Sequence, residues 1–325
     1  MVEILVVGRI KPEGLAILAA RPGIELRALD GDDPAAVLAA AATAAAILVR
    51  TTPIDADVIA AAPKLRVVSR HGVGYDNVDL AALNARGIPL AIAADANRIS
   101  VAEHALAMLL ALAKAAVPHD AAVRAGNWAI RNEFRAFEIF GKRLLLVGFG
   151  RIGREVASRA RAFGMTVAVH DPYVDPAALA DLGCQVAPSL DAAIAEADAI
   201  SLHLPLTEAT RHLIDARRLA QMKPGAILIN TARGGLIDEA ALAAALAAGR
   251  LRGAGIDVFA AEPPRPDNPL LAAPNALLSP HNAGVTDESM VRMATEAAQN
   301  ILDVLDGELD PGVIVNLDAV QRALR

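Results

Sequence analysis

Residues 144–154, with the sequence LLLVGFGRIGR, constrain the fold more than any other part of this chain. An apolar run predicts a buried strand that stops at Gly148, and an amphipathic helix is predicted over residues 154–163. A second apolar run, residues 165–170, follows and ends in Asp171-Pro172. Strand, glycine turn, helix, strand and acid in this order are typical of a βαβ unit that binds a dinucleotide.

Each glycine of the GFGRIG turn is expected to have its own physical role. Gly148 permits the tight turn, Gly150 lets the backbone approach a pyrophosphate, and Gly153 lets the helix pack close to its strand. The helix N-terminus offers unpaired N–H groups and partial positive charge to the phosphates. Asp171 can bond both ribose hydroxyls and repel a 2′-phosphate. The alternative is an ordinary βαβ turn, in which Asp171 only shapes the turn before Pro172.

Composition indicates a globular protein of two domains. The 325 residues are more than one hydrophobic core usually serves. Hydrophobic residues make up 54% and aromatic residues only 3%, so the cores must consist mainly of Ala, Leu, Val and Ile. The net charge of −6 argues against a nucleic-acid partner, although local basic residues can still hold a small anion. The single cysteine, Cys184, excludes an intramolecular disulfide and a cysteine-rich metal site, and it suits a reducing compartment.

The sequence also predicts a soluble, cytoplasmic protein with no membrane partner and no metal site. Met1 leads directly into the strand-like VEILVV without a basic region or a cleavage site, so we expect no signal peptide. The most apolar helical stretch, near residues 105–113, is too short to span a bilayer. Glu103, His104 and Lys114 flank it.

Short apolar runs alternate with alanine-rich helical segments on both sides of the nucleotide unit, which is typical of parallel sheets with covered faces. Strands before it are predicted at residues 3–7, 46–49, 66–69 and 89–92, with helices near 12–20, 34–42, 55–62 and 80–86. Strands after it are predicted at 199–203, 226–230, 255–258 and 276–278, followed by a helix at 288–305 and a short tail.

The simplest arrangement returns the end of the chain to the first domain. The predicted fold is therefore α/β, with two Rossmann-like, doubly wound parallel-sheet domains. A nucleotide domain, residues 97–285, is inserted into a discontinuous substrate domain, residues 1–96 and 286–325.

Ser100 and Glu103 form a predicted capping box that opens a helix running to about residue 117, where Pro118 ends it. The irregular segment that follows, residues 127–140, gathers aromatic side chains in a chain that has few. They are Trp128, Phe134, Phe137 and Phe140. This clustering suggests a packing surface between subunits or, alternatively, the wall of a pocket.

Three further stretches place polar or charged groups directly after predicted strands. They are NTARGG at 230–235, DVFAAEPP at 257–264 and SPHNAG at 279–284. Ligands of open parallel sheets bind beyond the carboxyl ends of the strands. We therefore expect Arg233, Asp257, Glu262 and His281 to converge on one crevice.

A hydride transfer at a hydroxy acid would need groups of these kinds. Arg233 offers a planar fork for a carboxylate and its neighbouring carbonyl. His281 has the intrinsic pKa of a proton donor near neutral pH. Glu262, on the other imidazole nitrogen, would fix the ring and favour its charged form. Each residue alone also fits a plain role: a surface arginine, a solvated glutamate, or a histidine that caps a turn.

Five segments together resemble the D-isomer-specific 2-hydroxyacid dehydrogenase family, and in particular its phosphoglycerate dehydrogenase-like branch without the regulatory domain. They are HGVGYDNVD (71–79), GFGRIG (148–153), NTARGGLIDEAAL (230–242), GAGIDVFAAEPP (253–264) and SPHNAG (279–284). The resemblance spans nearly the whole chain and implies an NAD-dependent oxidoreductase for a small D-2-hydroxy acid. It implies that Arg233 binds the substrate, that His281 is the acid/base and that Glu262 is its partner. Feedback control through a regulatory domain is not expected.

The resemblance also implies the contacts of the cofactor NAD and of the substrate. The cofactor residues are Gly148, Gly150, Arg151, Ile152, Gly153, Asp171, His203, Pro205, Thr210, Thr231, Ala232, Asp257 and Gly284. The substrate residues are Val73 and Gly74, through backbone N–H groups, together with Arg233 and His281. A homodimer formed through the nucleotide domain is implied as well.

The identity of the substrate depends on the role of Arg50 and Arg70, for which the sequence allows two alternatives. Their segments are similar to the substrate domain of phosphoglycerate dehydrogenases, where an arginine could hold a distal phosphate; the alternative is that both pair with acids at strand ends. The candidates are 3-phosphoglycerate, glycerate or hydroxypyruvate, and glyoxylate. A hypothesis of another class is an NAD(H)-sensing binding scaffold like the related corepressors. The intact set of Arg233, Glu262 and His281 counts against an inactive scaffold.

Overall fold

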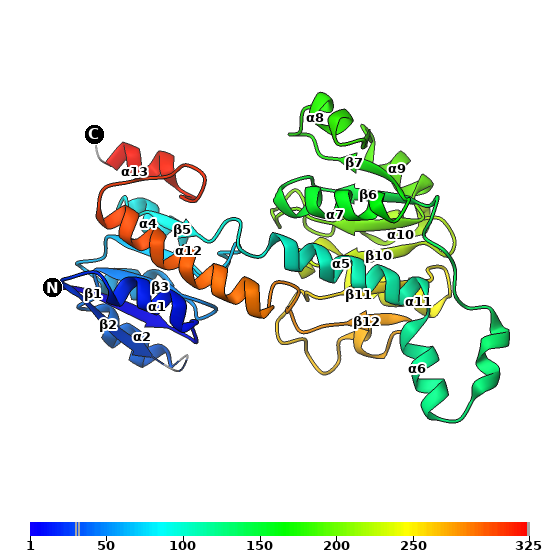
Figure 1. The fold of residues 1–325 in the computed structure, drawn as a ribbon, viewed down its shortest axis with the longest axis horizontal. Helices are drawn as coiled ribbons and strands as arrows, with labels where there is room; N and C mark the ends of the chain where they lie inside the picture. The colour runs from blue at the N-terminus through cyan, green and yellow to red at the C-terminus, as the bar shows by residue number, and fades with distance from the viewer. Residues whose placement is uncertain (30, 32, 324–325) are drawn as a thin grey trace. The chain divides into compact units, whose positions relative to one another are not determined.

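The computed structural model describes residues 1–29, 31 and 33–323. The chain divides into two compact units (Figure 1). Unit 1 consists of Met1–Asn97 and Val285–Arg325, and unit 2 consists of Arg98–Gly284. The chain therefore leaves unit 1, forms all of unit 2 and then returns to unit 1.

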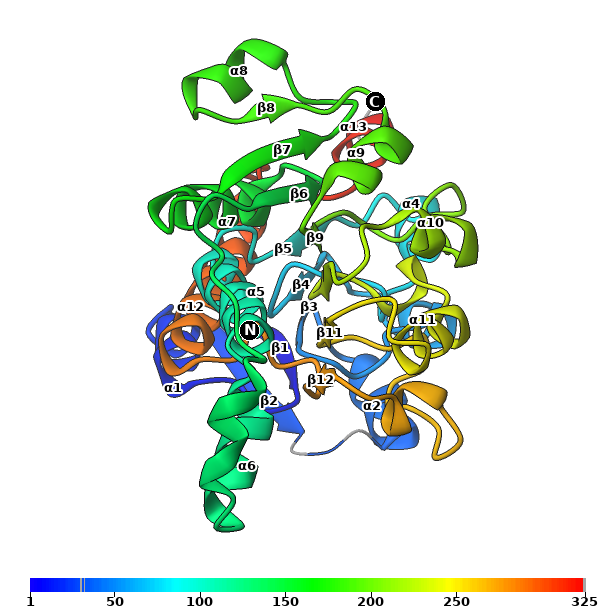
Figure 2. The same ribbon diagram turned by 90° about the vertical axis from the view of Figure 1, so that its right-hand side faces the viewer.

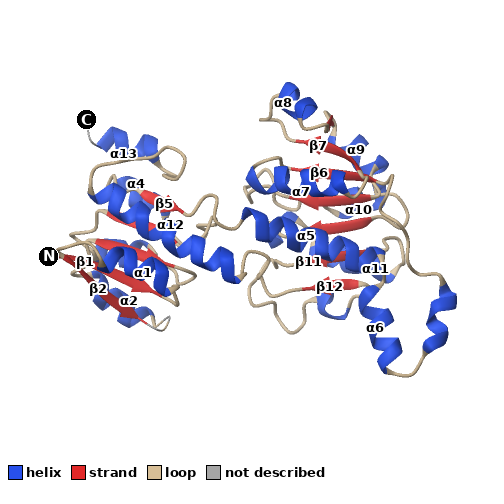
Figure 3. Cartoon of the chain, viewed as in Figure 1, coloured by secondary structure: helices blue, strands red, loops and turns tan. Residues whose placement is uncertain are grey.

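Unit 1 is built on a parallel sheet of five strands in the order β2-β1-β3-β4-β5. The strands are β1 (Val2–Val7), β2 (Ile24–Leu29), β3 (Ala46–Val49), β4 (Val67–Arg70) and β5 (Leu90–Ile92). Helices α1 (Pro12–Ala19) and α12 (Asp287–Leu305) bury apolar side chains on one face of the sheet. Helices α2 (Pro34–Ala41), α3 (Ala56–Ala61) and α4 (Leu80–Ala85) cover the other face, and α13 (Leu317–Ala323) follows α12 (Figure 3).

Helix α12 belongs to unit 1 because it packs closely on elements from the start of the chain. A Cβ on Gly14 of α1 would lie 2.4 Å from the carbonyl oxygen of Ala294, so only glycine permits this approach. The buried Asn300 of α12 donates from Nδ2 to the carbonyl oxygen of Ile92 at 3.0 Å. The return of the chain therefore completes the core of unit 1.

Unit 2 is built on a parallel sheet of seven strands in the order β12-β11-β10-β9-β6-β7-β8. The strands are β6 (Arg143–Val147), β7 (Thr166–His170), β8 (Gln185–Val186), β9 (Ala199–Leu202), β10 (Ile227–Asn230), β11 (Gly253–Ile256) and β12 (Ala276–Leu278). Figure 2 shows α5 (Arg98–Ala113) and α7 (Arg151–Ala162) on one face. On the other face lie α9 (Leu190–Glu196), α10 (Ala216–Gln221) and α11 (Glu239–Ala247).

The remaining elements of unit 2 are short. They are α6 (Ala116–Arg124), η1 (Trp128–Glu133), α8 (Pro176–Asp181), η2 (Gly234–Leu236) and η3 (Pro269–Ala272).

Both sheets are doubly wound, as the sequence predicted. The strand order reverses between β1 and β3 in unit 1 and between β6 and β9 in unit 2. A reversal of this kind opens a crevice beyond the carboxyl ends of the two strands, which is where α/β proteins bind their ligands. The prediction of two Rossmann-like α/β folds is therefore confirmed.

The predicted capping box at Ser100 is wrong. Helix α5 begins at Arg98, so Ser100 already lies inside the helix and is buried. A capping box does open α12, where the Thr286 hydroxyl accepts from the N–H of Ser289 at 3.2 Å and the Ser289 hydroxyl accepts from the N–H of Thr286 at 3.0 Å.

The predicted end of this helix at Pro118 is also wrong. Helix α5 ends at Ala113 because Ala115 adopts a left-handed conformation with φ of 51°. A new helix, α6, then begins at Ala116. Pro118 falls in its first turn, where the missing N–H removes no hydrogen bond.

Helix α6 and the segment after it extend from the sheet of unit 2 as an arm, residues 116–135 (Figures 1 and 2). No residue of α6 is buried within the chain. Among the described residues, no single helix could cross a membrane by length and composition; only α5 and α6 pass that test, as a pair bent by 59°.

Candidate active site

The glycine turn follows β6 at the reversal of strand order in unit 2. Gly148 has φ of 93°, and a Cβ there would lie 2.2 Å from the carbonyl oxygen of His203, which follows β9. A Cβ on Gly153 would lie 2.6 Å from the carbonyl oxygen of Gly148. A Cβ on Gly150, by contrast, would meet no atom within 4 Å. Packing within the protein therefore explains the need for glycine at 148 and 153, whereas Gly150 leaves the backbone of the turn uncovered.

Helix α7 begins at Arg151, directly after this turn, with Ile152 in its first turn. Gly150 is its N-cap, and no side chain accepts a hydrogen bond there. Three or four backbone N–H groups of a helix N-terminus need acceptors from outside the helix. An anion such as a phosphate supplies them and also suits the helix dipole.

Asp171 connects the turn to the end of β7. Its Oδ2 accepts from the N–H of Phe149 at 2.8 Å, and its Oδ1 accepts from the N–H of Tyr173 at 2.9 Å. An ionised carboxylate has about four acceptor positions, so these bonds leave others for a ligand hydroxyl. Asp171 therefore shapes the turn before Pro172, as the alternative to dinucleotide binding predicted. It also keeps free acceptor positions, which ribose binding requires.

Polar side chains also follow β9 and β10. Burial lowers the pKa of His203 to about 4, so the ring is neutral at pH 7, and its Nε2 lies 2.8 Å from the Ser201 hydroxyl. Thr210 donates from its hydroxyl to the carbonyl oxygen of Pro205 at 2.8 Å and so closes the turn after β9. Thr231 has a buried hydroxyl with no hydrogen-bond partner among the described residues. An orphaned hydroxyl at the same edge of the sheet as the bare glycine turn fits a polar ligand such as a dinucleotide.

The turn that carries Arg233 presses against the loop that carries Glu262. A Cβ on Gly234 would lie 1.9 Å from the carbonyl carbon of Phe259, which is backbone and cannot move aside cheaply. The buried Asn230 holds the turn from the other side: its Nδ2 donates to the carbonyl oxygen of Arg233 at 2.9 Å, and its Oδ1 accepts from the N–H of Ala232 at 3.0 Å. This close approach brings two segments of the predicted site together.

His281 and Glu262 form a close pair, with His281 Nδ1 lying 2.6 Å from Glu262 Oε2. Both are partly accessible, with side-chain exposures of 51% and 36%. Burial alone raises the pKa of Glu262, but hydrogen bonds from His281 and from the N–H of Phe259, with the charges of His281 and Arg233, bring it below its usual value. An ionised carboxylate only accepts, so Nδ1 carries the hydrogen and Nε2 is the nitrogen left for proton exchange.

Asp257 is fully buried beneath the segment that carries His281. Its carboxylate accepts from the Ser279 hydroxyl at 2.5 Å and from the N–H groups of Asn282 and Ala283 at 2.9 and 3.0 Å. Gly284 ends unit 2 directly after these anchors. Arg233, Asp257, Glu262 and His281 therefore lie within one connected set of loops in unit 2.

The remaining predicted residues lie in unit 1. Arg50 follows β3 and Arg70 ends β4, beside the loop that contains Val73 and Gly74. Arg50 forms no ion pair with an acid in the part of the chain that the structure describes, which weakens the strand-end pairing alternative for this residue. Burial, together with the charges of Arg70 and Arg50, lowers the pKa of His71 to about 4.

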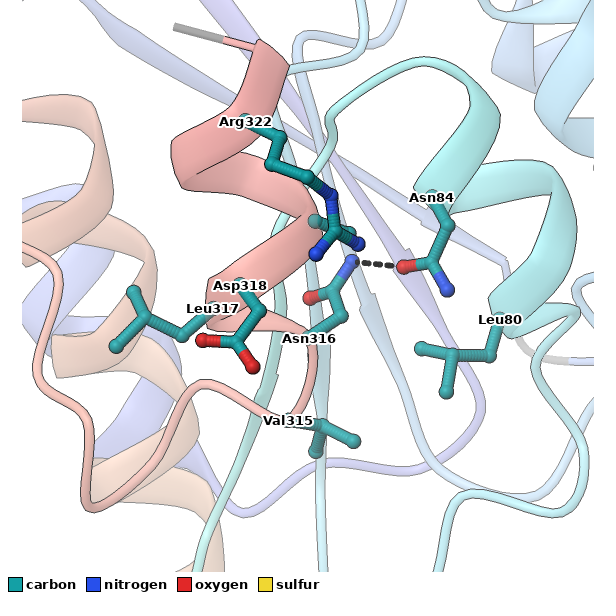
Figure 4. Close-up of a pocket in the computed structure, with 8 residues that line it drawn as sticks. Leu80, Asn84, Val315, Asn316, Leu317, Asp318 and Arg322 are labelled. Atoms are coloured by element: carbon teal, nitrogen blue, oxygen red, sulfur yellow. Dashed lines mark hydrogen bonds between the residues drawn. The ribbon is translucent and has the colours of Figure 1, made fainter.

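Unit 1 also has a cavity of about 290 Å³ between α4 and α13, where Asn316 donates from Nδ2 to Asn84 Oδ1 at 2.8 Å (Figure 4). Its lining residues are Leu80, Asn84, Val315, Asn316, Leu317, Asp318, Ala319 and Arg322. None of them belongs to the predicted site. Within residues 1–29, 31 and 33–323, no cluster of three or more His, Cys, Asp or Glu side chains could hold a metal ion.

Two polar residues of this region were not predicted as part of the site. Glu239, at the start of α11, accepts from the N–H of Ala260 at 2.7 Å and from Asn268 Nδ2 at 2.8 Å, so it holds the loop that carries Glu262. His104 of α5 lies 3.0 Å from the Ser279 hydroxyl. No sequence signal marked His104, because its partner Ser279 lies 175 positions away. An acid at a helix start is too common to have identified Glu239.

Comparison with known proteins identifies the family. A strand, a glycine turn and a helix at the reversal of a doubly wound sheet define a dinucleotide-binding α/β protein. Residues 106–283 match the model of the NAD binding domain of the D-isomer specific 2-hydroxyacid dehydrogenases. The chain belongs to this family, as the five sequence segments indicated.

Individual relatives agree with this assignment. The chain is 46% identical over 312 residues to D-3-phosphoglycerate dehydrogenase of Mycobacterium bovis, covering 96% of this chain and 58% of that protein. It is 41% identical over 274 residues to glyoxylate reductase of Korarchaeum cryptofilum, covering 83% of this chain and 82% of that protein. Its structure is similar to that of D-lactate dehydrogenase from Aquifex aeolicus complexed with NAD and lactic acid, with a TM-score of 0.87, 30% identity and coverage of 96% and 98%. The chain thus spans little more than half the length of its mycobacterial relative.

The contact between Gly234 and Phe259 can be tested with Gly235 as the matched control. Gly234→Ala should lower the free energy of unfolding by about 1–3 kcal/mol, as overpacking against fixed backbone does. Gly235→Ala should cost less, because the nearest atoms to its Cβ, at 2.8 and 3.2 Å, belong to the flexible side chain of Leu206. Urea unfolding followed by circular dichroism measures both variants. Equal costs would show that the close approach at Gly234 is not a constraint.

Proposed function

We propose that this protein is an NAD-dependent dehydrogenase that interconverts a small D-2-hydroxy acid and its 2-oxo acid. The observation that carries the proposal is the 2.6 Å pair of His281 and Glu262, in the same unit as an uncovered glycine turn. Family membership and the names of the relatives support it.

In the proposed mechanism His281 Nε2 gives a proton to the substrate oxygen during reduction and removes it during oxidation. Glu262 holds the ring through Nδ1 and favours the imidazolium. Arg233 binds the carboxylate and polarises the carbonyl, and backbone N–H groups of Val73 and Gly74 also bind the carboxylate. NAD, when bound, supplies the hydride acceptor or donor.

We propose the same cofactor contacts that the sequence indicated. The turn and the N-terminus of α7, with Gly148, Gly150, Arg151, Ile152 and Gly153, would hold the pyrophosphate. Asp171 would bind the ribose. The remaining contacts would come from residues that follow the strands of unit 2, namely His203, Pro205, Thr210, Thr231, Ala232, Asp257 and Gly284.

For the substrate we propose that Arg50 and Arg70 select the distal group. Arg50 follows β3 at the reversal of strand order in unit 1, the position at which such a sheet binds ligands. Arg70 is fixed by its Nε, which donates to Asn77 Oδ1 at 3.2 Å. Two cations there suit a phosphate or a second carboxylate better than an apolar group.

The deciding experiment is NADH oxidation with a panel of 3-phosphohydroxypyruvate, hydroxypyruvate and glyoxylate. Preference for the phosphorylated acid would make Arg50 and Arg70 phosphate ligands. Preference for the others would make the protein a hydroxypyruvate or glyoxylate reductase. Absence of turnover on the whole panel would contradict the proposal.

His281→Ala tests the proposed acid/base. This variant should lower kcat by about 10²–10⁴-fold, while NADH binding, measured by NADH fluorescence, stays within about twofold of the native value.

Glu262→Gln tests the proton donor through pH. Losing an anionic partner disfavours the imidazolium, so reduction should lose activity at lower pH than in the native protein. The alkaline limb of the kcat/KM profile for 2-oxo acid reduction should therefore be displaced to lower pH. Glu25→Gln, at an exposed position of β2, serves as the control and should leave the profile in place. An undisplaced limb in Glu262→Gln would remove this residue from the mechanism.

Asp171 variants test the choice of NAD over NADP. Asp171→Ala and Asp171→Asn both remove the charge that repels a 2′-phosphate, and each should reduce the preference for NAD by about tenfold or more, equal to 1.4 kcal/mol. The asparagine oxygen can still accept from the N–H of Phe149, but the amide nitrogen cannot accept from the N–H of Tyr173, so Asp171→Asn should lose less stability than Asp171→Ala. The kcat/KM ratio for the two cofactors provides the measurement. If only the alanine variant changed, Asp171 would be a turn residue and not a ribose ligand.

We also propose a homodimer, formed through unit 2, in the cytoplasm. Large apolar side chains stand exposed on the arm and after it, among them Trp128 at 67% and Phe134 at 87%. A second copy of the chain would cover them. Sedimentation should give twice the chain mass, and Trp128→Glu with Phe134→Glu should give the single mass. A native monomer would contradict this part of the proposal.

A further inference from the structure

The segment 279–283 holds His281 in an unusual backbone conformation. His281 has φ of 50°, in the left-handed region that non-glycine residues rarely occupy. Its own N–H donates to the carbonyl oxygen of Asp257 at 2.7 Å. The next two N–H groups, of Asn282 and Ala283, donate to the Asp257 carboxylate. A strained conformation persists only where its surroundings over-determine it, and here one buried residue supplies that constraint.

The Ser279 hydroxyl lies within hydrogen-bond distance of both Asp257 and His104, and the direction of each bond can be assigned. The Ser279 hydroxyl lies 2.5 Å from Asp257 Oδ1 and 3.0 Å from His104 Nε2. A carboxylate only accepts, so the single hydroxyl hydrogen of Ser279 goes to Asp257. The serine oxygen must then accept from His104, which carries a hydrogen on Nε2. The chain of donation runs from His104 to Ser279 to Asp257.

The glycines of β11 place His104 at this point. A Cβ on Gly255 would lie 2.8 Å from the Met108 side chain, and a Cβ on Gly253 would lie 2.8 Å from the Leu112 side chain. Both of these side chains belong to α5. Glycine at both positions therefore lets α5 lie close against the sheet, so that its earlier residue His104 reaches the segment after β12. The side chain of His104 is 27% exposed, whereas that of Asp257 is only 1% exposed.

We infer that His104 is a positioning residue for His281 and acts through Ser279 and Asp257. It donates the hydrogen bond that fixes the Ser279 hydroxyl on Asp257 and so holds the segment 279–283 in its strained form. The inference rests on the proposed role of His281 in proton transfer. His104 itself has no contact with the reacting atoms in this assignment.

The test compares His104→Leu, which removes the donor, with His104→Gln, whose side-chain amide keeps one. In reduction of the preferred 2-oxo acid, His104→Leu should lower kcat by about ten- to a hundredfold, the range expected for a small displacement of a catalytic group. KM and NADH affinity should stay within about twofold. His104→Gln should recover most of kcat. His119→Leu, a histidine of α6, is the matched control and should behave as the native protein.

Amide hydrogen exchange gives a second readout that does not need turnover. The N–H groups of Asn282 and Ala283 should exchange slowly in the native protein and about tenfold faster in His104→Leu. Ser279→Ala should give the same increase, and adding His104→Leu to it should change little more, because both act on one chain of hydrogen bonds. Ser279→Ala alone still tests the anchor if His104→Leu folds poorly.

Native kcat and native exchange in His104→Leu would overturn the inference. A His104→Gln variant as impaired as His104→Leu would overturn it too, because the donated hydrogen bond would then not be the cause. If the native protein turned over no 2-oxo acid but exchange responded as expected, the proposed function would fail while the anchoring of the segment stood.

Discussion

Parallel strand pairing is the constraint on which the rest of this structure depends. Strands that run in one direction end at the same edge of the sheet, and each needs a crossover, here mostly helical, before the next can begin. In unit 2 the strands β6, β9, β10, β11 and β12 are consecutive neighbours, and each is followed by a loop with polar groups. Residues more than a hundred positions apart, such as Gly148 and His281, are therefore delivered to one edge.

Close backbone approaches turn that common edge into a site. The carbonyl of His203 occupies the space of a side chain at Gly148, and the backbone of Phe259 occupies that space at Gly234. Glycine at these two positions lets neighbouring loops touch where larger residues would separate them by a layer of side chains. The contact at Gly234 involves the loop that carries Glu262, the partner of His281.

The sequence sufficed for the features whose cause is local. The run of GFGRIG between two apolar strands, with Asp171 after the second, carries its own turn, helix and strand signals, and it led to the correct fold class. The placement of Arg233, Asp257, Glu262 and His281 after strands was equally readable. Their roles in chemistry remain predictions, because no ligand contact tests them.

Features imposed by tertiary contacts escaped the sequence. The sequence near Ala115 does not indicate a left-handed residue, yet Ala115 adopts this conformation and divides the predicted long helix into α5 and α6. Strand β2 lies at the sheet edge with Glu25, Arg27 and Ala28 exposed, so its apolar signal is weak. His104 could not be assigned because its partner Ser279 lies 175 positions away.

The return of α12 to unit 1 has a consequence for how the protein is made. Unit 2 is one continuous stretch, so a ribosome delivers all of its strands before the chain reaches Val285. Unit 1 emerges first but lacks the apolar side chains of α12, including Ala297, Ala298 and Ile301, that complete one face of its sheet. Domains fold as units when their chain is complete. The first unit to be synthesised is therefore the last to close, and until then α1 alone covers the face of its sheet that α1 and α12 later share.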